Sequence, residues 1–112
     1  MGHRSMSDIV RFAAKRHAAF GALGTLEIVG QAARCFTRQE AGVVSRALDA
    51  VATGASPERQ IFMSPIASDH EFEAVASDEG LRVLGAPLDD VMLSWAQARA
   101  LSTLLRAFSA GA

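Results

Sequence analysis

The chain has 112 residues, of which 50% are hydrophobic and 21% are charged, and its formal net charge at pH 7 is −1. This size suits one domain with its own core, and the composition is typical of globular rather than disordered chains. The near-neutral charge argues against nonspecific binding to nucleic acid, and no apolar run approaches the roughly 20 residues that span a bilayer. We therefore expect residues 7–112 to form a single α+β domain outside the membrane.

The first residues hold no apolar segment of the signal-peptide type. We interpret residues 1–6 as a disordered start or a remnant of cloning, and we expect a cytoplasmic protein. The single cysteine, Cys35, cannot form an intramolecular disulfide, which also favours a reducing compartment. Ten of the 11 basic residues are arginine, and asparagine and tyrosine are absent. This bias predicts a GC-rich bacterial genome as the source.

The first predicted element is a helix over residues 8–20, whose apolar residues share one face. Those residues are Ile9, Phe12, Ala13 and Phe20. Hydrophobicity then alternates, which predicts two antiparallel strands at residues 26–29 and 32–36 around a turn at 30–31.

Two later helices carry complete start and stop signals. Thr37 with Glu40, and Ser94 with Gln97, have the spacing of a capping box, and a glycine follows each segment. Apolar residues recur at intervals of three and four, so each helix should bury one face. These faces comprise Ala41, Val44, Leu48 and Val51 in the first helix and Ala98, Leu101, Leu104, Leu105 and Phe108 in the second.

Three further strands are predicted between these helices, at residues 60–64, 71–76 and 81–84. A turn near residues 67–69 and a second turn at Gly80 separate them. The whole pattern predicts an antiparallel or mixed sheet of four to six strands, with about three helices packed on one face.

The two capped helices also resemble each other in sequence. Residues 37–54 match 94–111 at an offset of 57 with five identities, and the preceding strands match at an offset of 55. This favours a possible duplication of a strand–loop–helix unit, as residues 25–54 and 80–111, whose copies could pack about a pseudo-twofold axis. The alternative is that capped amphipathic helices after strands resemble one another without common descent.

The densest polar cluster covers residues 68–71, with Glu73 beyond it, and could supply a general base or metal ligands. Strand alternation would turn His70 away from Asp69 and Glu71, which favours a solvated turn. A cleft in which His70 meets two acidic groups would instead favour catalysis. The cysteine has no histidine near it in sequence and is expected to be inert. We predict no catalytic residues, no metal and no cofactor.

Trp95, Val43 and Ala50 lie off the apolar faces and are candidate partner contacts. We therefore expect a homodimer and a noncatalytic protein–protein interaction module. The alternative is a small-molecule or nucleic-acid binding protein that uses the Arg-rich N-terminal half, although nucleic acid is disfavoured by the net charge. Its candidate contacts are Arg11, Lys15, Arg16, Arg34 and Arg38.

Overall fold

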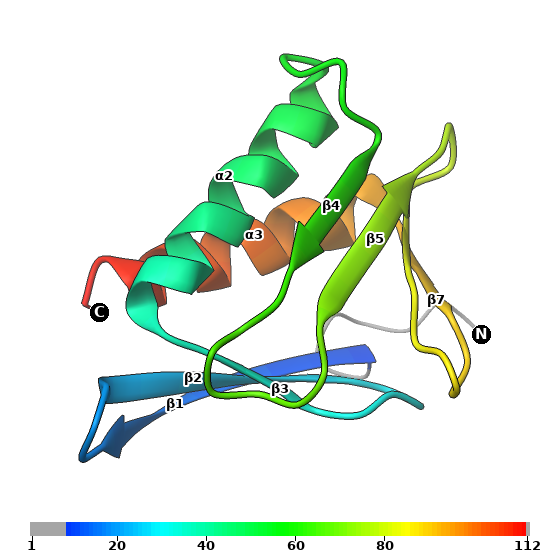
Figure 1. Cartoon of the computed structure of the whole chain (residues 1–112). Coiled ribbons are helices and arrows are strands. Elements are labelled where there is room, and N and C mark those ends of the chain that lie inside the picture. Colours follow the sequence, from blue (N-terminus) through cyan, green and yellow to red (C-terminus); the bar gives the residue numbers. More distant parts are fainter. Residues whose placement is uncertain (1–8, 112) are drawn as a thin grey trace.

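The computed structural model describes residues 9–111, which form two helices and two antiparallel sheets (Figure 1). The predicted α+β class is confirmed, whereas the single sheet and the third helix are wrong for this part of the chain. Residues 1–6, assigned to the start, lie outside the described residues. The first sheet comprises β1 (Val10–His17), β2 (Gly21–Ile28) and β3 (Arg34–Phe36). The second comprises β4 (Gln60–Met63), β5 (Phe72–Ala76), β6 (Leu81–Val83) and β7 (Val91–Leu93), and the helices are α2 (Arg38–Thr53) and α3 (Trp95–Ser109).

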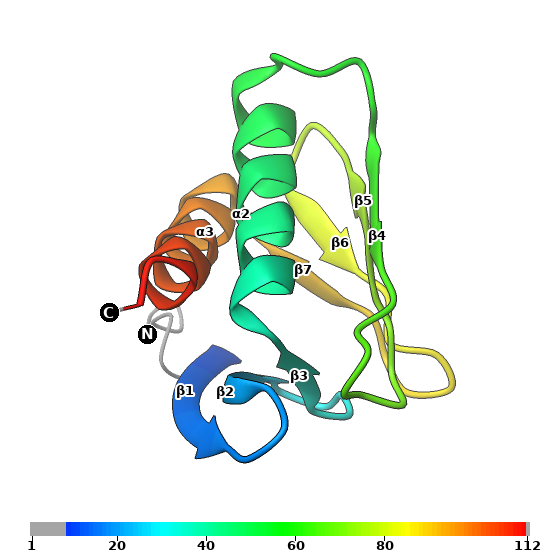
Figure 2. The same cartoon turned by 60° about the vertical axis from the view of Figure 1, so that its left-hand side comes forward.

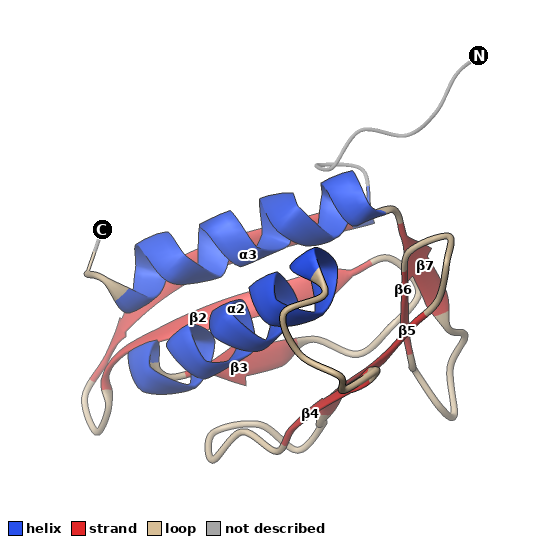
Figure 3. Cartoon of the chain, turned by 90° about the horizontal axis from the view of Figure 1, so that it is seen from above, coloured by secondary structure: helices blue, strands red, loops and turns tan. Residues whose placement is uncertain are grey.

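The two helices pack against each other, and strands of both sheets contact them (Figures 2 and 3). Every helix and strand in residues 9–111 contributes a buried side chain to one connected apolar core. Phe36 of the first sheet and Phe72 of the second meet edge to face, with ring centroids 6.3 Å apart. Among the described residues, neither helix has the length and hydropathy needed to cross a lipid bilayer.

The first predicted helix is wrong for residues 10–20, which form β1 and the turn after it. β1 pairs with β2 along all eight of its residues. Val10 and Phe12 pack in the core and alternate with exposed Arg11, which is the period of a strand. Two residues that a helix would have buried, Ala13 and Phe20, are exposed. The helical spacing of the apolar residues was therefore coincidental.

The start and stop signals of the two other helices are confirmed. The Thr37 N–H donates to Glu40 Oε1 at 2.9 Å, and the Ser94 N–H donates to Gln97 Oε1 at 2.8 Å. Each hydroxyl accepts in return from the backbone N–H of its partner, so both capping boxes are complete. Gly54 ends α2 with φ +74°, the left-handed conformation that favours glycine.

The predicted strands at 60–64, 71–76 and 81–84 are confirmed as β4, β5 and β6. β7 was not predicted, because Val91–Leu93 is an apolar triplet too short to show alternation and follows a loop rich in acidic residues. Its pairing with β6 completes the hairpin that leads into α3.

The hairpins that precede the two helices have the same strand register. Each pair of the β2–β3 ladder becomes a pair of the β6–β7 ladder when 57 is added to both residue numbers. One offset thus relates both hairpins and both helices, and the offset of 55 for the strands is not needed. The pairs are Gly24↔Phe36, Thr25↔Cys35 and Leu26↔Arg34 in the first hairpin, and Leu81↔Leu93, Arg82↔Met92 and Val83↔Val91 in the second.

Two buried serines, also 57 residues apart, lie where the helices cross. The hydroxyl oxygens of Ser45 and Ser102 are 2.9 Å apart. Each hydroxyl is also within hydrogen-bond distance of the other residue's carbonyl oxygen, at 3.0 and 3.1 Å. The helices run in opposite directions, because Arg38 at the start of α2 contacts Phe108 near the end of α3.

Candidate functional site

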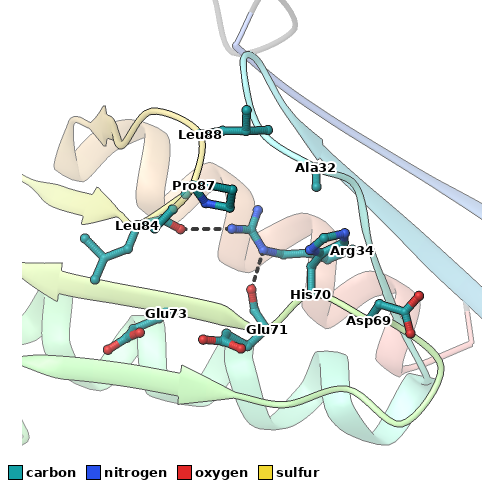
Figure 4. Close-up of a pocket in the computed structure, with 11 residues that line it drawn as sticks. Ala32, Arg34, Asp69, His70, Glu71, Glu73, Leu84, Pro87 and Leu88 are labelled. Atoms are coloured by element: carbon teal, nitrogen blue, oxygen red, sulfur yellow. Dashed lines mark hydrogen bonds between the residues drawn. The ribbon is translucent and has the colours of Figure 1, made fainter.

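Arg34 joins the two sheets. It begins β3, and its Nε donates to the carbonyl oxygen of Glu71 at 2.7 Å while Nη2 donates to that of Leu84 at 3.1 Å (Figure 4). These carbonyls lie just before β5 and just after β6. The Phe72 ring centroid is 5.6 Å from the guanidinium carbon, which adds a cation–π contact. One side chain thus fixes the first sheet on the second.

The charge of Arg34 is buried and incompletely satisfied. The residue is 3% exposed, and its Nη1 has no hydrogen-bond partner among residues 9–111. The ion pair found in these residues joins Arg106 to Asp49, so no described carboxylate lies within 4.0 Å of the guanidinium. Burial lowers the pKa of Arg34 below its ordinary value, and the Glu71 carboxylate partly offsets this. A buried charged donor without an acceptor is costly, and an anion would satisfy it.

Gln31 makes a second connection between the sheets, from the loop before β3. Its Nε2 donates to the carbonyl oxygens of Val83 at 3.0 Å and Asp89 at 2.9 Å. Gly85 permits this approach, because a Cβ there would lie 2.7 Å from Nε2. The amide oxygen Oε1 is buried and has no partner in the described part of the chain. The loop before β3 and the loop before β7 are therefore in direct polar contact.

Arg34 lines a cavity of about 380 Å³ between these loops and the start of β5. Its volume falls within the range of small-molecule sites. Figure 4 shows Nη1 directed toward Pro87 and Leu88, away from the two carbonyls that hold the guanidinium. The lining combines an apolar part, Ala32, Leu84, Gly85, Ala86, Pro87 and Leu88, with a polar part, Arg34, Asp69, His70, Glu71 and Glu73.

The acidic cluster predicted from sequence lies on this cavity. Asp69 and His70 belong to the loop before β5, Glu71 directly precedes the strand, and all three line the cavity. Within residues 9–111, however, the imidazole forms no hydrogen bond with a carboxylate, and no group of three acidic, histidine or cysteine side chains is arranged to hold a metal ion. The cluster therefore supplies charge to the cavity rather than a recognisable acid–base pair.

The other basic candidates lie elsewhere. Arg11, Lys15 and Arg16 are exposed on β1, the first two on one side of the strand and the third on the other. Arg38 donates to the carbonyl oxygen of Phe108 and lies 4.7 Å from its ring centroid. The structure thus places two of the five predicted contacts in internal interactions and three on the edge strand β1.

The predicted partner contacts occupy different environments. Val43 on α2 is 41% exposed, Ala50 is half-buried, and half-buried Trp95 packs against the core. Leu104, expected to be buried on α3, is 39% exposed, so that expectation is wrong. Cys35 is half-buried on β3, with its Sγ 3.6 Å from Thr25 Oγ1.

Neither Gln31 nor the loop that holds Pro87 and Leu88 was predicted from the sequence as part of a site. Their role depends on contacts between residues about 50 positions apart, which local patterns do not contain. Comparison with protein-family models, curated proteins and solved structures found no match to the chain.

Proposed function

We propose that this protein is a noncatalytic binding protein that holds a small molecule through an anionic group, a carboxylate or a phosphate, at Arg34. The observation that carries the proposal is the buried guanidinium, which lines a cavity and has one nitrogen without an acceptor. Its other two donor positions are held by backbone carbonyls, so the free N–H groups are preorganised. A charge-assisted hydrogen bond to them would be strong in this buried setting.

Binding requires a small rearrangement at the mouth of the cavity. Nη1 is shielded from solvent, and Pro87 and Leu88 are the residues toward which it points. Both belong to the stretch 86–90, in which every residue is exposed. Moving their side chains would therefore uncover little core surface. We expect the anionic group to enter between this loop and Ala32.

We further propose that the segments predicted as repeats, residues 25–54 and 80–111, derive from a duplicated unit, in which the common offset of 57 pairs residues 25–54 with 82–111. The common offset in ladder register, capping boxes and the serine contact supports this. In this comparison Arg34 corresponds to Val91 and Gln31 to Leu88. The buried charge then replaces an apolar residue, which is the kind of local departure expected at a functional position.

The test is a titration with acetate and inorganic phosphate, followed by NMR through the Arg34 Nε–H and the amides of Gly85 and Leu88. We expect saturable shifts at these groups with affinity on the order of 10 mM. Ala32→Asp should compete for the guanidinium and weaken binding at least tenfold, because Ala32 lines the cavity. Ala33→Asp is the matched control, since this neighbour is exposed and does not line it. Shifts that do not saturate, or equal effects of both variants, would contradict the proposal.

A protein-partner surface is the second candidate function. The exposed apolar side chains of Val43 and Leu104, on the two packed helices, support it. The homodimer, the cytoplasmic location and the bacterial source stay predictions. Sedimentation of the wild type and Val43→Asp tests the surface: we expect a dimer that the substitution dissociates, and a monomer at high concentration would exclude the homodimer.

A further inference from the structure

We infer that the anionic group is a carboxylate with an apolar tail, so that the ligand is a monocarboxylic acid and not a phosphate ester. This inference rests on the proposed function, because it places the carboxylate at Nη1 of Arg34. It adds two statements about the ligand: its head carries a single negative charge, and the atoms next to the head are aliphatic carbons.

The surroundings of the free nitrogen are the first argument. Nη1 is directed toward Pro87 and Leu88, away from the two carbonyl oxygens that hold the guanidinium (Figure 4). Both side chains are apolar and, with Ala32, line the cavity, and Leu88 is 52% exposed. A carboxylate bound at Nη1 would therefore have its first carbon atoms against an apolar loop. A hydrocarbon tail would cover this exposed surface, which stabilises the complex.

The charge of the cavity is the second argument. Among the described residues that line it, Arg34 is the one permanent cation, and Asp69, Glu71 and Glu73 are acidic. None of these carboxylates lies within 4.0 Å of the guanidinium, and Figure 4 shows them turned away from Nη1. The guanidinium thus balances a single negative charge. A phosphate monoester carries a charge of about −1.5 to −2 at pH 7, and the lining offers no permanent cation for the second charge.

The donor set is the third argument. The unpaired donor found on Arg34 is a single nitrogen, Nη1. One donor nitrogen suffices for a carboxylate, whereas a phosphate group has three acceptor oxygens and is commonly bound by several backbone N–H groups at the start of a helix. Both helices of the described chain begin elsewhere, because neither Arg38 nor Trp95 lines the cavity. The donors therefore favour a carboxylate over a phosphate.

The experiment titrates the full chain at neutral pH with four ligands and follows the Arg34 Nε–H and the backbone amides by NMR. 4-Methylpentanoate has the proposed head and tail, acetate lacks the tail, 4-methylpentanamide lacks the charge, and 3-methylbutyl phosphate joins a similar tail to a dianionic head. We expect 4-methylpentanoate to bind about tenfold more tightly than acetate, because its tail removes apolar surface from water. Its advantage over the amide and the phosphate ester should also be about tenfold or more.

Two variants test the position of the tail. Leu88→Ala should lower affinity for 4-methylpentanoate but not for acetate, because it shortens the apolar wall and leaves Arg34 in place. Ile66→Ala is the matched control and should change neither affinity, since this isomeric side chain is 72% exposed and does not line the cavity. Thermal unfolding of both variants establishes that they are folded. Unchanged binding of 4-methylpentanoate to Leu88→Ala would overturn the placement of the tail.

The outcomes distinguish the inference from the proposed function. Equal affinities for 4-methylpentanoate and acetate would overturn the apolar tail while leaving an anion site. A phosphate ester that binds as tightly as 4-methylpentanoate would overturn the single charge, and the anion site would again stand. Binding of the amide as tight as that of the acid would overturn the role of Arg34 and with it the proposed function. Binding of none of the four would overturn the inference, and the titration with inorganic phosphate would then decide whether an anion site remains.

Discussion

The segments β2–β3–α2 and β6–β7–α3 share a backbone plan but differ in what they bury. Their ladders have the same register, and both helices begin with a complete capping box. At one equivalent pair of positions, however, the first segment buries Arg34 where the second packs Val91 against the core. The same geometry therefore accepts either a charge or an aliphatic side chain.

The difference extends to the loops. Gln31 occupies the position equivalent to Leu88, and Gln31 and Arg34 hold the two buried side-chain atoms without partners in residues 9–111. Such atoms cost free energy that an apolar residue would not. The first segment thus has an unpartnered polar atom at two positions where the second segment has an apolar side chain.

The largest expected effect comes from replacing Arg34 with valine, the residue at the equivalent position of the second segment. Arg34→Val should lower the free energy of unfolding by about 3 kcal/mol, because it removes two hydrogen bonds between the sheets, leaves two partly buried carbonyl oxygens without this donor and opens a void. Val91→Ala is the control and should cost only about 1 kcal/mol, since Val91 is half-buried. Urea denaturation measures both. If Arg34→Val were as stable as the wild type, Arg34 would not be the connection between the sheets.

A smaller effect is expected at the helix crossing. Ser45 and Ser102 occupy equivalent positions and make reciprocal contacts there, but Ser102 has one additional partner. Ser102 Oγ lies 2.7 Å from Asp49 Oδ1, in addition to its contacts with Ser45. Ser102→Ala should therefore cost about 2 kcal/mol and Ser45→Ala about 1 kcal/mol. Denaturation of both variants and of the double variant gives their coupling. Additive effects in the double variant would contradict a direct interaction of the two hydroxyls.

The helix caps should give equal effects. Thr37→Ala and Ser94→Ala each remove a hydroxyl that accepts from the first turn, so each should cost about 1 kcal/mol. Thr53→Ala, an exposed hydroxyl near the end of α2, is the control. Unequal losses at the two caps, measured by thermal unfolding, would show that the segments differ in their helices as well as in their buried residues.

The elements with local signals were predictable from the sequence. The caps of α2 and α3 rest on residues three positions apart, and β4 to β6 show alternation within a few residues. β1 was not, because Ile9, Phe12 and Phe20 have helical spacing, and only the pairing with β2 makes residues 10–17 a strand. The burial of Arg34 was not predictable either, because the residues that accept its hydrogen bonds are 37 and 50 positions away in the sequence. Its residue type suggested a binding role, but its burial became visible only in the fold.

The smallest expected effect concerns pH. In Ala32→Asp the new carboxylate would pair with Arg34, whose buried charge lacks a counterion within 4.0 Å, and its pKa should fall below that of the unfolded chain. A carboxyl whose pKa is lowered on folding stabilises the protein above its unfolded pKa and loses this contribution as the pH falls through its folded pKa.

We therefore expect Ala32→Asp to gain up to about 1 kcal/mol, relative to Ala33→Asp, at pH 7 and to lose this gain by about pH 3. Because both variants share all other titrating groups, their difference isolates the new pair. Urea denaturation at the two pH values measures it. A difference that does not change with pH would mean that the cavity side of Arg34 cannot be reached by a carboxylate, and an anionic ligand would face the same barrier.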